Sequence, residues 1–297
     1  MTGAASKHMR VLADLGLFYS AAIWGSTFFI VKSTLADIDP VMLVAYRFLL
    51  AGLILLVFAL ITRRPIKAGW GKAAWVGSLL WMLYIPQTIG LGYTTASNSG
   101  FITGLFVAFV PLFLLTIFRR RPSIMEIIAS MIALLGLWIL TGGLVDINVG
   151  DMLTLVAAIT YALHLLYSDK YMKTGIDPFV FSCQQFLAVG AASLATGCLF
   201  NLPFGIGSAT AFGNLLFLTL FPTLLAFVIQ MMAQKIRSPL RVSLIFALEP
   251  VFAALFAWTM GNEIFVPHRA AGGLVIFLAL VVSGLPWPPR RNPASGQ

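Results

Sequence analysis

The sequence predicts an all-α integral membrane protein with ten transmembrane helices. Ten apolar stretches fill most of the 297 residues, and each is long enough to cross a bilayer, which takes about 20 apolar residues per helix. The composition agrees, because 60% of the residues are hydrophobic and only 10% are charged. No room is left for a soluble domain. The predicted spans are residues 10–35, 40–62, 73–94, 98–118, 123–142, 151–169, 178–200, 212–235, 239–260 and 267–287.

The chain between the spans predicts how they follow one another. The first span is too long, and too closely followed by others, to be a cleaved signal peptide. The connections are short, so we expect successive helices to run antiparallel. A polar, proline-rich tail over 291–297 is expected to be disordered.

The basic residues predict the orientation of the helices. If the N-terminus is cytoplasmic, all but three of the Lys and Arg residues lie on the cytoplasmic side, whereas the loops of the other side are acidic. This positive-inside pattern predicts that both termini are cytoplasmic. The cytoplasmic cations would be Lys7, Arg10, Arg63, Arg64, Lys67, Lys72, Arg119, Arg120, Arg121, Lys170, Lys173, Lys235, Arg237, Arg241, Arg290 and Arg291.

The charge and cysteine patterns also restrict the partners. The net charge of +9 is spread over loops that flank the membrane, which argues for contact with the lipid bilayer and against a nucleic-acid partner. Cys183 and Cys198 lie several turns apart on one predicted helix, where they cannot form a disulfide with each other. No metal-ligand spacing occurs, and we expect no metal ion and no other cofactor.

An internal repeat divides the chain into two halves. The segment DPVMLVAYRFLLAG at 39–52 aligns with DPFVFSCQQFLAVG at 177–190. The match predicts a first repeat of five helices over 1–145 and a second over 146–290. Because five is odd, the second repeat enters the membrane from the opposite face. Many secondary transporters have this inverted architecture, with the substrate site between the repeats.

Four prolines inside the predicted spans support the same division. Pro86 recurs as Pro222 and Pro111 as Pro250, at nearly the same spacing as the two Asp-Pro segments. Each proline removes a backbone hydrogen bond, which lipid tolerates only where neighbouring groups or water satisfy the freed carbonyl. We expect the four prolines to face a cavity or to act as hinges. The alternative is that they only curve the bundle.

Several segments resemble the drug/metabolite transporter superfamily in its EamA-domain form. They are WGSTFFIVK (24–32), DPVMLVAYRFLLAG (39–52), YTTASNSGFITGLFVAFVPL (93–112) and SPLRVSLIFALEPVFAAL (238–255). With the repeat, the resemblance covers essentially the whole chain, and it is strongest to YddG-type amino-acid exporters of the bacterial inner (plasma) membrane. The resemblance implies a central cavity lined mainly by the first, third, fourth, sixth, eighth and ninth helices, and export of small metabolites.

Polar and aromatic side chains form stripes on four predicted spans. Polar groups inside membrane helices are costly and usually face the bundle interior, and helical spacing places each stripe on one face. Such a mixture suits a cavity for a small organic solute, although the same groups could form hydrogen bonds between helices. The stripes are Ser20, Trp24 and Thr27; Trp81, Tyr84 and Thr88, with Gln87 beside them; Thr160, His164 and Tyr167; and Thr223, Phe227, Gln230 and Gln234.

Three ionisable residues lie within or near the apolar core. Glu249 could carry a proton, bind a substrate ammonium group, cap backbone groups freed by Pro250, or be neutral. Arg47 lies near the outer end of its span, and we expect it to snorkel or to pair with backbone rather than to bind substrate. His164 could take up a proton near neutral pH, although a neutral, hydrogen-bonded histidine is the more common case.

These observations favour a secondary transporter that exports amino acids and related metabolites by alternating access. The scarcity of cations inside the spans favours zwitterionic or weakly polar solutes over phosphorylated ones. A channel is less favoured because no selectivity-filter sequence occurs. The chain is not expected to be an enzyme, because no nucleophile–base pair or HExxH motif occurs. The predicted substrate-binding residues are Trp24, Trp81, Tyr84, Gln87, Thr88, His164, Tyr167, Gln230 and Glu249.

Within the transporter class, efflux of drugs and lipophilic cations is the alternative. An aromatic, largely neutral cavity would also suit such solutes, especially beside Glu249. No G-x-x-x-x-G-K-[ST] motif occurs, so ATP drive would need another protein. A monomer is expected to be sufficient, because the inverted repeat supplies both halves of the pathway.

Overall fold

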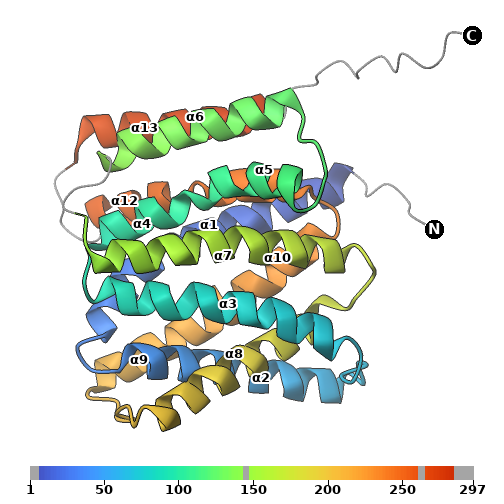
Figure 1. The fold of residues 1–297 in the computed structure, drawn as a ribbon, viewed down its shortest axis with the longest axis vertical. Coiled ribbons are helices and arrows are strands. Elements are labelled where there is room, and N and C mark those ends of the chain that lie inside the picture. Colours follow the sequence, from blue (N-terminus) through green and yellow to red (C-terminus); the bar gives the residue numbers. More distant parts are fainter. Residues whose placement is uncertain (1–6, 143–146, 260–264, 284–297) are drawn as a thin grey trace, which may run out of the picture.

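The computed structural model describes residues 7–142, 147–259 and 265–283, and every regular element in these residues is helical (Figure 1). The elements are α1 (Lys7–Thr34), α2 (Pro40–Ile61), α3 (Trp70–Leu91), α4 (Ala96–Gly104), α5 (Phe106–Thr116), α6 (Ile124–Thr141), α7 (Val149–Met172), α8 (Pro178–Leu199), α9 (Ala209–Leu218), the π-helical turn η1 (Thr219–Leu225), α10 (Ala226–Gln234), α11 (Pro239–Phe246), α12 (Glu249–Thr259) and α13 (Pro267–Ser283).

Nine helical stretches among the described residues are long and apolar enough to cross a membrane, and they confirm the first nine predicted spans. Three of these stretches are interrupted: α4 with α5, α9 with η1 and α10, and α11 with α12. A further apolar helix, α13, has 17 residues. The rest of the predicted tenth span (284–287), the tail over 291–297 and the predicted boundary at 145–146 lie outside the described residues.

Two Asp-Pro pairs begin equivalent helices of the two repeats. Asp39 accepts hydrogen bonds from the backbone amides of Val41 (2.8 Å) and Met42 at the start of α2. Asp177 does the same for the start of α8. The proline that follows each aspartate occupies the first turn, where no backbone N–H is needed. The aligned segments are therefore matched helix starts.

Helices α2 and α8 pack against each other with two-fold symmetry. A methyl group added to Gly52 would lie 2.9 Å from Leu187 Cδ2, and one added to Gly190 would lie 2.6 Å from Leu49 Cγ. The two glycines occupy equivalent positions in the aligned segments, and so do the two leucines. Only glycine permits this close approach, so the repeat in the sequence is a repeat in the packing.

The other helices follow the same symmetry. In Figure 1 the pair α6 and α13 lies at one extreme of the bundle and the pair α2 and α8 lies towards the other. Between these pairs, α1 packs against α10, α11 and α12, whereas α7 packs against α3, α4 and α5. Exchange of the two repeats converts one set of neighbours into the other. The fold therefore consists of two inverted repeats with α1 and α7 at the centre.

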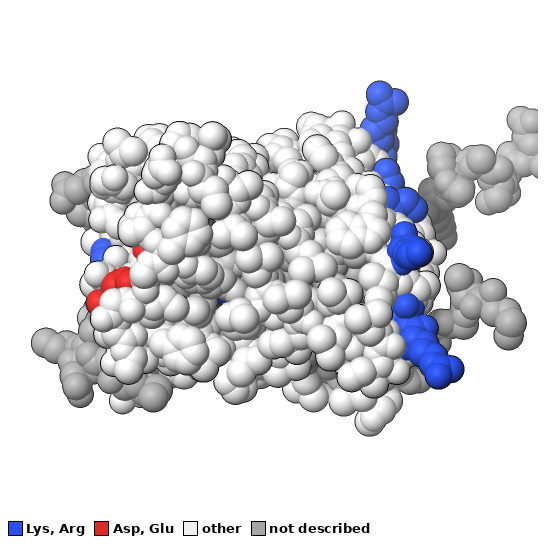
Figure 2. Space-filling view, turned by 90° about the horizontal axis from the view of Figure 1, so that it is seen from below, with Lys and Arg blue, Asp and Glu red and all other residues white. Residues whose placement is uncertain are grey.

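Charge distinguishes the two ends of the bundle (Figure 2). The start of α1 and the loops after α2, α5, α7 and α10 lie at one end. This end carries most of the Lys and Arg residues and is called the basic end below. The loops after α1, α3 and α8 lie at the opposite end, with Asp37, Asp39 and Asp151. Figure 2 shows a broad uncharged band between the ends, as a lipid-facing surface requires.

All five ion pairs between described residues lie at the basic end, and four of them join the first repeat to the second. They are Arg64–Asp177, Arg120–Asp169, Lys173–Asp169, Arg237–Asp14 and Arg241–Asp14.

The four predicted hinge prolines have different settings. Pro86 and Pro111 lie inside the continuous helices α3 and α5, and the break before α5 falls at Leu105. Pro222 lies in the π-helical turn η1. Pro250 is in the first turn of α12, directly after the break between α11 and α12. Two of the four thus lie at or beside an irregular turn, and their role as hinges stays a prediction.

Candidate functional site

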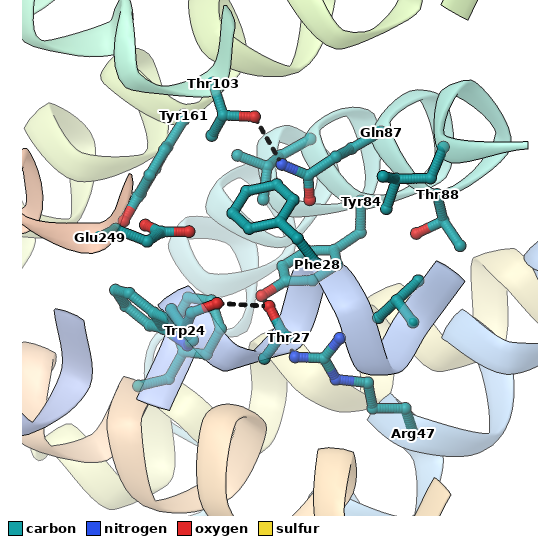
Figure 3. Close-up of a pocket in the computed structure, with 14 residues that line it drawn as sticks. Trp24, Thr27, Phe28, Arg47, Tyr84, Gln87, Thr88, Thr103, Tyr161 and Glu249 are labelled. Carbon is teal, nitrogen blue, oxygen red and sulfur yellow. Dashed lines mark hydrogen bonds between the residues drawn. The ribbon is translucent and has the colours of Figure 1, made fainter. Parts of the chain in front are cut away.

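Figure 3 shows a cavity in close-up. Its lining residues place it between the middle of the bundle and the opposite end. It is lined by residues of α1, α2, α3, α4, α7, α10 and α12, so both repeats contribute. Val31 and Leu91, in the last turns of α1 and α3, line its outer part. Five of the nine predicted substrate-binding residues line it. They are Trp24, Tyr84, Gln87, Thr88 and Glu249.

The cavity is small in this structure. Its volume is about 30 Å³, which is room for about one water molecule, whereas pockets that bind organic ligands measure roughly 300–1,000 Å³. An organic solute therefore requires the helices around the cavity to move apart. The structure therefore shows a site that is too small for such a solute.

Glu249 reaches the cavity because the ninth span is interrupted. The helix tightens after α11, where the Leu248 amide donates to the Ile245 carbonyl at 3.1 Å, and α12 begins at Glu249. Gly25 of α1 packs directly on this start, since an added methyl group would lie 2.6 Å from the Glu249 backbone oxygen. The Glu249 side chain forms no hydrogen bond or ion pair with another described residue, and Figure 3 shows it pointing into the cavity.

Arg47 lies across the cavity from Glu249 (Figure 3). Its Nε donates to Thr223 Oγ1, one Nη2 hydrogen bond of 3.5 Å reaches the Tyr84 hydroxyl, and its guanidinium carbon lies 4.8 Å from the Tyr84 ring centroid. It is only 3% exposed and has no carboxylate partner among the described residues. The expectation that Arg47 snorkels is therefore wrong, because its head group lies in the interior.

The π-helical turn η1 positions Trp24 at the cavity. Pro222 has no backbone N–H, so the chain widens there, and Thr223 Oγ1 donates to the Leu218 carbonyl at 2.7 Å. The Pro222 carbonyl accepts a hydrogen bond of 2.7 Å from Trp24 Nε1 of α1. The Trp24 ring then packs on Phe227, with ring centroids 5.0 Å apart. The proline thus joins two spans at the wall of the cavity.

Phe227 forms the floor of the cavity on its basic-end side. Its ring lies 5.0–6.4 Å from five other rings, measured between centroids. Three of them belong to cavity-lining or neighbouring residues of the first repeat: Trp24, Phe48 and Tyr84. A fourth is the imidazole of His164, at 5.9 Å. The ring therefore lies between the cavity and His164.

The remaining four predicted residues lie outside the cavity. His164 is fully buried, and its Nε2 is 3.0 Å from Gln185 Oε1. Gln230 is fully buried one turn beyond Phe227. Trp81 lies one turn from Tyr84 on the basic-end side of α3. Tyr167 packs against Trp75 and Phe118 near the basic end, with ring centroids 5.6 and 5.1 Å apart.

Several cavity residues were not predicted as binding residues. Tyr161 and Phe28 add aromatic surface, and Thr103 accepts a 2.8 Å hydrogen bond from Gln87 Nε2. Arg47 carried a usable signal, because it lies about two turns inside an apolar span and its repeat equivalent is the neutral Gln185. Phe28 and Thr103 carried none, because similar residues occur throughout the spans.

Comparison with known proteins agrees with this architecture. The sequence matches the EamA-like transporter family twice, over residues 11–142 and 148–285. The chain belongs to this family. Membership identifies the protein as a membrane transporter of the drug/metabolite transporter superfamily rather than an enzyme, and the two matches coincide with the two repeats of the fold.

Relatives extend over nearly the full length of the chain. An uncharacterized transporter of Archaeoglobus fulgidus is 30% identical over 285 residues, which are 95% of this chain and 89% of that protein. The uncharacterized inner membrane transporter YedA of Escherichia coli K12 is 29% identical over 288 residues, with 90% of each chain covered. A crystal structure with 18% identity superimposes with a TM-score of 0.78 over 92% of this chain and 96% of that one, which supports the fold.

Proposed function

We propose that this EamA-family transporter exports amino acids, both aromatic and other neutral or small ones, together with related metabolites. The observation that carries the proposal is a basic and an acidic side chain in one cavity. Arg47 and Glu249 both line it, and neither forms an ion pair with another described residue. Buried charged groups are normally paired, so two that are left apart in a cavity suggest a ligand that carries both complements.

A zwitterionic amino acid matches this arrangement. Its carboxylate is suited to the planar donors of Arg47 and the hydroxyl of Tyr84, and its ammonium group to the Glu249 carboxyl. The rings of Trp24, Phe28 and Tyr161 provide apolar walls for a side chain. A solute with only one of the two charges would leave the other protein group buried without a partner, which is costly.

Transport then requires two states of the inverted repeat. The cavity lies towards the opposite end and is too small for an amino acid here, so the bound state must be wider. The interruptions at Leu105 in the fourth span, at η1 in the eighth and before α12 in the ninth offer places where helix segments can move. Exchange of the conformations of the two repeats would open the basic end instead, which is alternating access.

Location and orientation are part of the proposal. Lys and Arg gather at one end of the bundle, so we place the basic end in the cytoplasm and the cavity towards the outside. The name of the relative YedA includes the inner membrane, which supports a bacterial inner membrane for this chain as well. One chain contains both walls of the cavity, so we propose a monomer as the functional unit.

The test is flux in proteoliposomes with three matched solutes: phenylalanine, its decarboxylated amine phenethylamine, and its deaminated acid 3-phenylpropanoate. We expect saturable flux of phenylalanine and much weaker flux of the two analogues. The Glu249→Gln variant should weaken discrimination against the acid. It has no carboxyl at this position that would be left without an ammonium partner when the acid binds. Lys67→Gln, in an exposed loop at the basic end, is the matched control and should transport as the unaltered protein does.

Efflux of lipophilic cations is the competing outcome. Glu249 beside Trp24 and Tyr161 would also suit a bulky organic cation, but Arg47 in the same cavity opposes it. Phenethylamine transported as well as phenylalanine would favour that alternative. Absence of flux for all three solutes, in protein shown to be folded, would contradict the amino-acid proposal.

A further inference from the structure

Four fully buried polar residues lie on the basic-end side of the cavity, and they retain polar atoms without hydrogen-bond partners among the described residues. The atoms are His164 Nδ1, Ser168 Oγ, Gln230 Nε2 and Oε1, and Gln234 Oε1. Each of these residues is 0% exposed. Buried polar groups are normally hydrogen-bonded, so an unpaired set of this size requires an explanation. These four residues are called the unpaired polar set below.

The unpaired polar set continues the faces of two helices that line the cavity. On α7 and on α10, a cavity-lining aromatic residue is followed by two members of the set, at the third and seventh positions after it. That spacing places all three on one helix face. Both helices run from the opposite end to the basic end, and they are in contact. The two series are Tyr161, His164 and Ser168 on α7, and Phe227, Gln230 and Gln234 on α10.

Contacts between the helices place the two series together. Gln234 Nε2 donates to the Leu165 carbonyl of α7 at 2.9 Å, and the His164 ring lies 5.9 Å from the Phe227 ring. A third helix contributes in the same way, because Trp81 of α3 lies one turn on the basic-end side of Tyr84 and its Nε1 also has no partner among the described residues. Polar atoms without partners among the described residues thus lie on three helices on the basic-end side of the cavity.

We propose that the unpaired polar set and Trp81 line the basic-end half of the transport pathway. This half is a polar chamber that is closed here and takes up water and solute when the basic end opens. Its amides, hydroxyl and imidazole are hydrogen-bonding groups without a fixed pair of charges, so they suit passage of a hydrated polar solute rather than tight binding. The inference rests on the proposed function only in that a polar solute crosses the protein.

Beyond the proposed chamber, an ion-pair cluster joins α1 to α11 at the basic end. It consists of Asp14, Arg237 and Arg241 and is called the Asp14 ion-pair cluster below. Asp14 of α1 accepts a hydrogen bond of 2.6 Å from Arg237 Nε and lies 3.4 Å from Arg241 Nη2. Arg241 also donates to the Leu280 carbonyl of α13 at 2.9 Å. Arg237 follows Gln234 closely in the chain, so the cluster lies next to the chamber. Opening of the chamber would have to separate α1 from the start of α11.

Cysteine labelling tests the chamber without any transported solute. Ser168→Cys and Gln230→Cys are made separately in protein that lacks Cys183 and Cys198, and a charged, membrane-impermeant thiol reagent is added to proteoliposomes. A marker variant, Lys67→Cys, reports which molecules present the basic end to the reagent. We expect slow labelling from that side, and an increase of at least about fivefold when Asp14→Asn disrupts the cluster, as expected for coupling of this kind. Arg237→Gln is tested in parallel as a second way to disrupt it.

Met232→Cys is the matched control, because Met232 lies between Gln230 and Gln234 in sequence but is 49% exposed on the outer surface of α10. It should stay unreactive in both backgrounds, since lipid excludes a charged reagent. The proposal would be overturned if Ser168→Cys and Gln230→Cys are labelled as slowly as Met232→Cys after the cluster is disrupted. This comparison is made in Asp14→Asn and Arg237→Gln protein that is shown to be folded. Labelling of the two cysteines without amino-acid flux would support the chamber and contradict amino acids as the substrates. Amino-acid flux without labelling would support amino acids as substrates and contradict the chamber.

Discussion

The two ends of this transporter are built differently. The basic end carries all five ion pairs of the described residues, and buried polar atoms without partners lie on its side of the cavity. At the opposite end, the repeats are joined by neutral or single-charge hydrogen bonds, such as Ser208 to Asp37 at 2.8 Å and Asn214 to Thr34 at 3.0 Å. The cavity lies on that side.

The difference shows how a pseudo-symmetric fold can prefer one state. The helix packing of the two repeats is equivalent, as the matched glycines of α2 and α8 demonstrate. The side chains at the two ends are not equivalent, because among the described residues only the basic end joins the repeats through ion pairs. When the contacts that join the repeats are stronger at one end than at the other, the protein favours the state in which the stronger contacts are intact. We infer that the ion pairs hold the basic end closed while the cavity side is free to open.

The largest expected effect comes from removal of a charge inside the cavity. Arg47→Gln should lower kcat/KM for phenylalanine roughly 10- to 150-fold, because a hydrogen bond to a charged group contributes about 1.5–3 kcal/mol. The measurement is initial flux in proteoliposomes over a range of concentrations. Lys67→Gln removes a cation from an exposed loop at the basic end and should leave kcat/KM unchanged. Equal losses in the two variants would mean that overall charge, rather than the cavity, controls transport.

Most of the fold could be predicted because its determinants are local in sequence. Apolar length fixes the spans, and the aspartates before Pro40 and Pro178 fix where two equivalent helices begin. The interruptions could not be predicted in detail. Pro111 indicated an irregularity in the fourth span, but the break falls more than a turn earlier, at Leu105. A proline in the sequence shows that one backbone hydrogen bond is missing. Which neighbouring turn becomes irregular depends on how the helix packs.

The candidate site was predictable by helix face but not by depth. The stripes of α3, α7 and α10 do face the interior, yet Tyr84 lines the cavity whereas Trp81, His164 and Gln230 lie one turn towards the basic end. Helical periodicity fixes the direction of a side chain around the axis, and the position of a cavity along the axis depends on how all the helices pack. Arg47 was misjudged for a related reason, because its distance from the end of its span did not reveal the neighbours η1 and α3.

Disruption of the basic end should give the next largest effect. Asp14→Asn should lower the free energy of unfolding by about 2 kcal/mol, because the partly buried Arg237 loses charge-assisted hydrogen bonds. Thermal unfolding in detergent, in a double-mutant cycle with Arg237→Gln, separates their coupling from the individual losses. Asp37→Asn at the opposite end is the matched control and should cost less, because its partner there is the hydroxyl of Ser208. Equal losses of unfolding free energy in Asp14→Asn and Asp37→Asn would contradict the inference that the two ends differ in strength.

A single hydrogen bond at the cavity wall should contribute less. Trp24→Phe leaves the Pro222 carbonyl without its donor and should cost about 1–2 kcal/mol beyond the lost volume. Trp81→Phe is the matched control, since Trp81 Nε1 has no partner among the described residues and the same volume is lost. The difference between the two variants in thermal unfolding therefore measures the bond to η1. A cost for Trp81→Phe as large as that for Trp24→Phe would show that the Pro222 carbonyl finds another partner.

The smallest effect is expected for a second ion pair of the same end. Arg120 is 60% exposed and lies 4.0 Å from Asp169, so Arg120→Gln should change the free energy of unfolding by about 0.5 kcal/mol or less. Thermal unfolding beside Asp14→Asn gives the comparison. A large loss of unfolding free energy in Arg120→Gln would mean that ion pairs outside the Asp14 cluster also stabilise the basic end. A small loss would localise it to the Asp14 cluster, where partial burial strengthens the charges and where α1 meets α11 and α13.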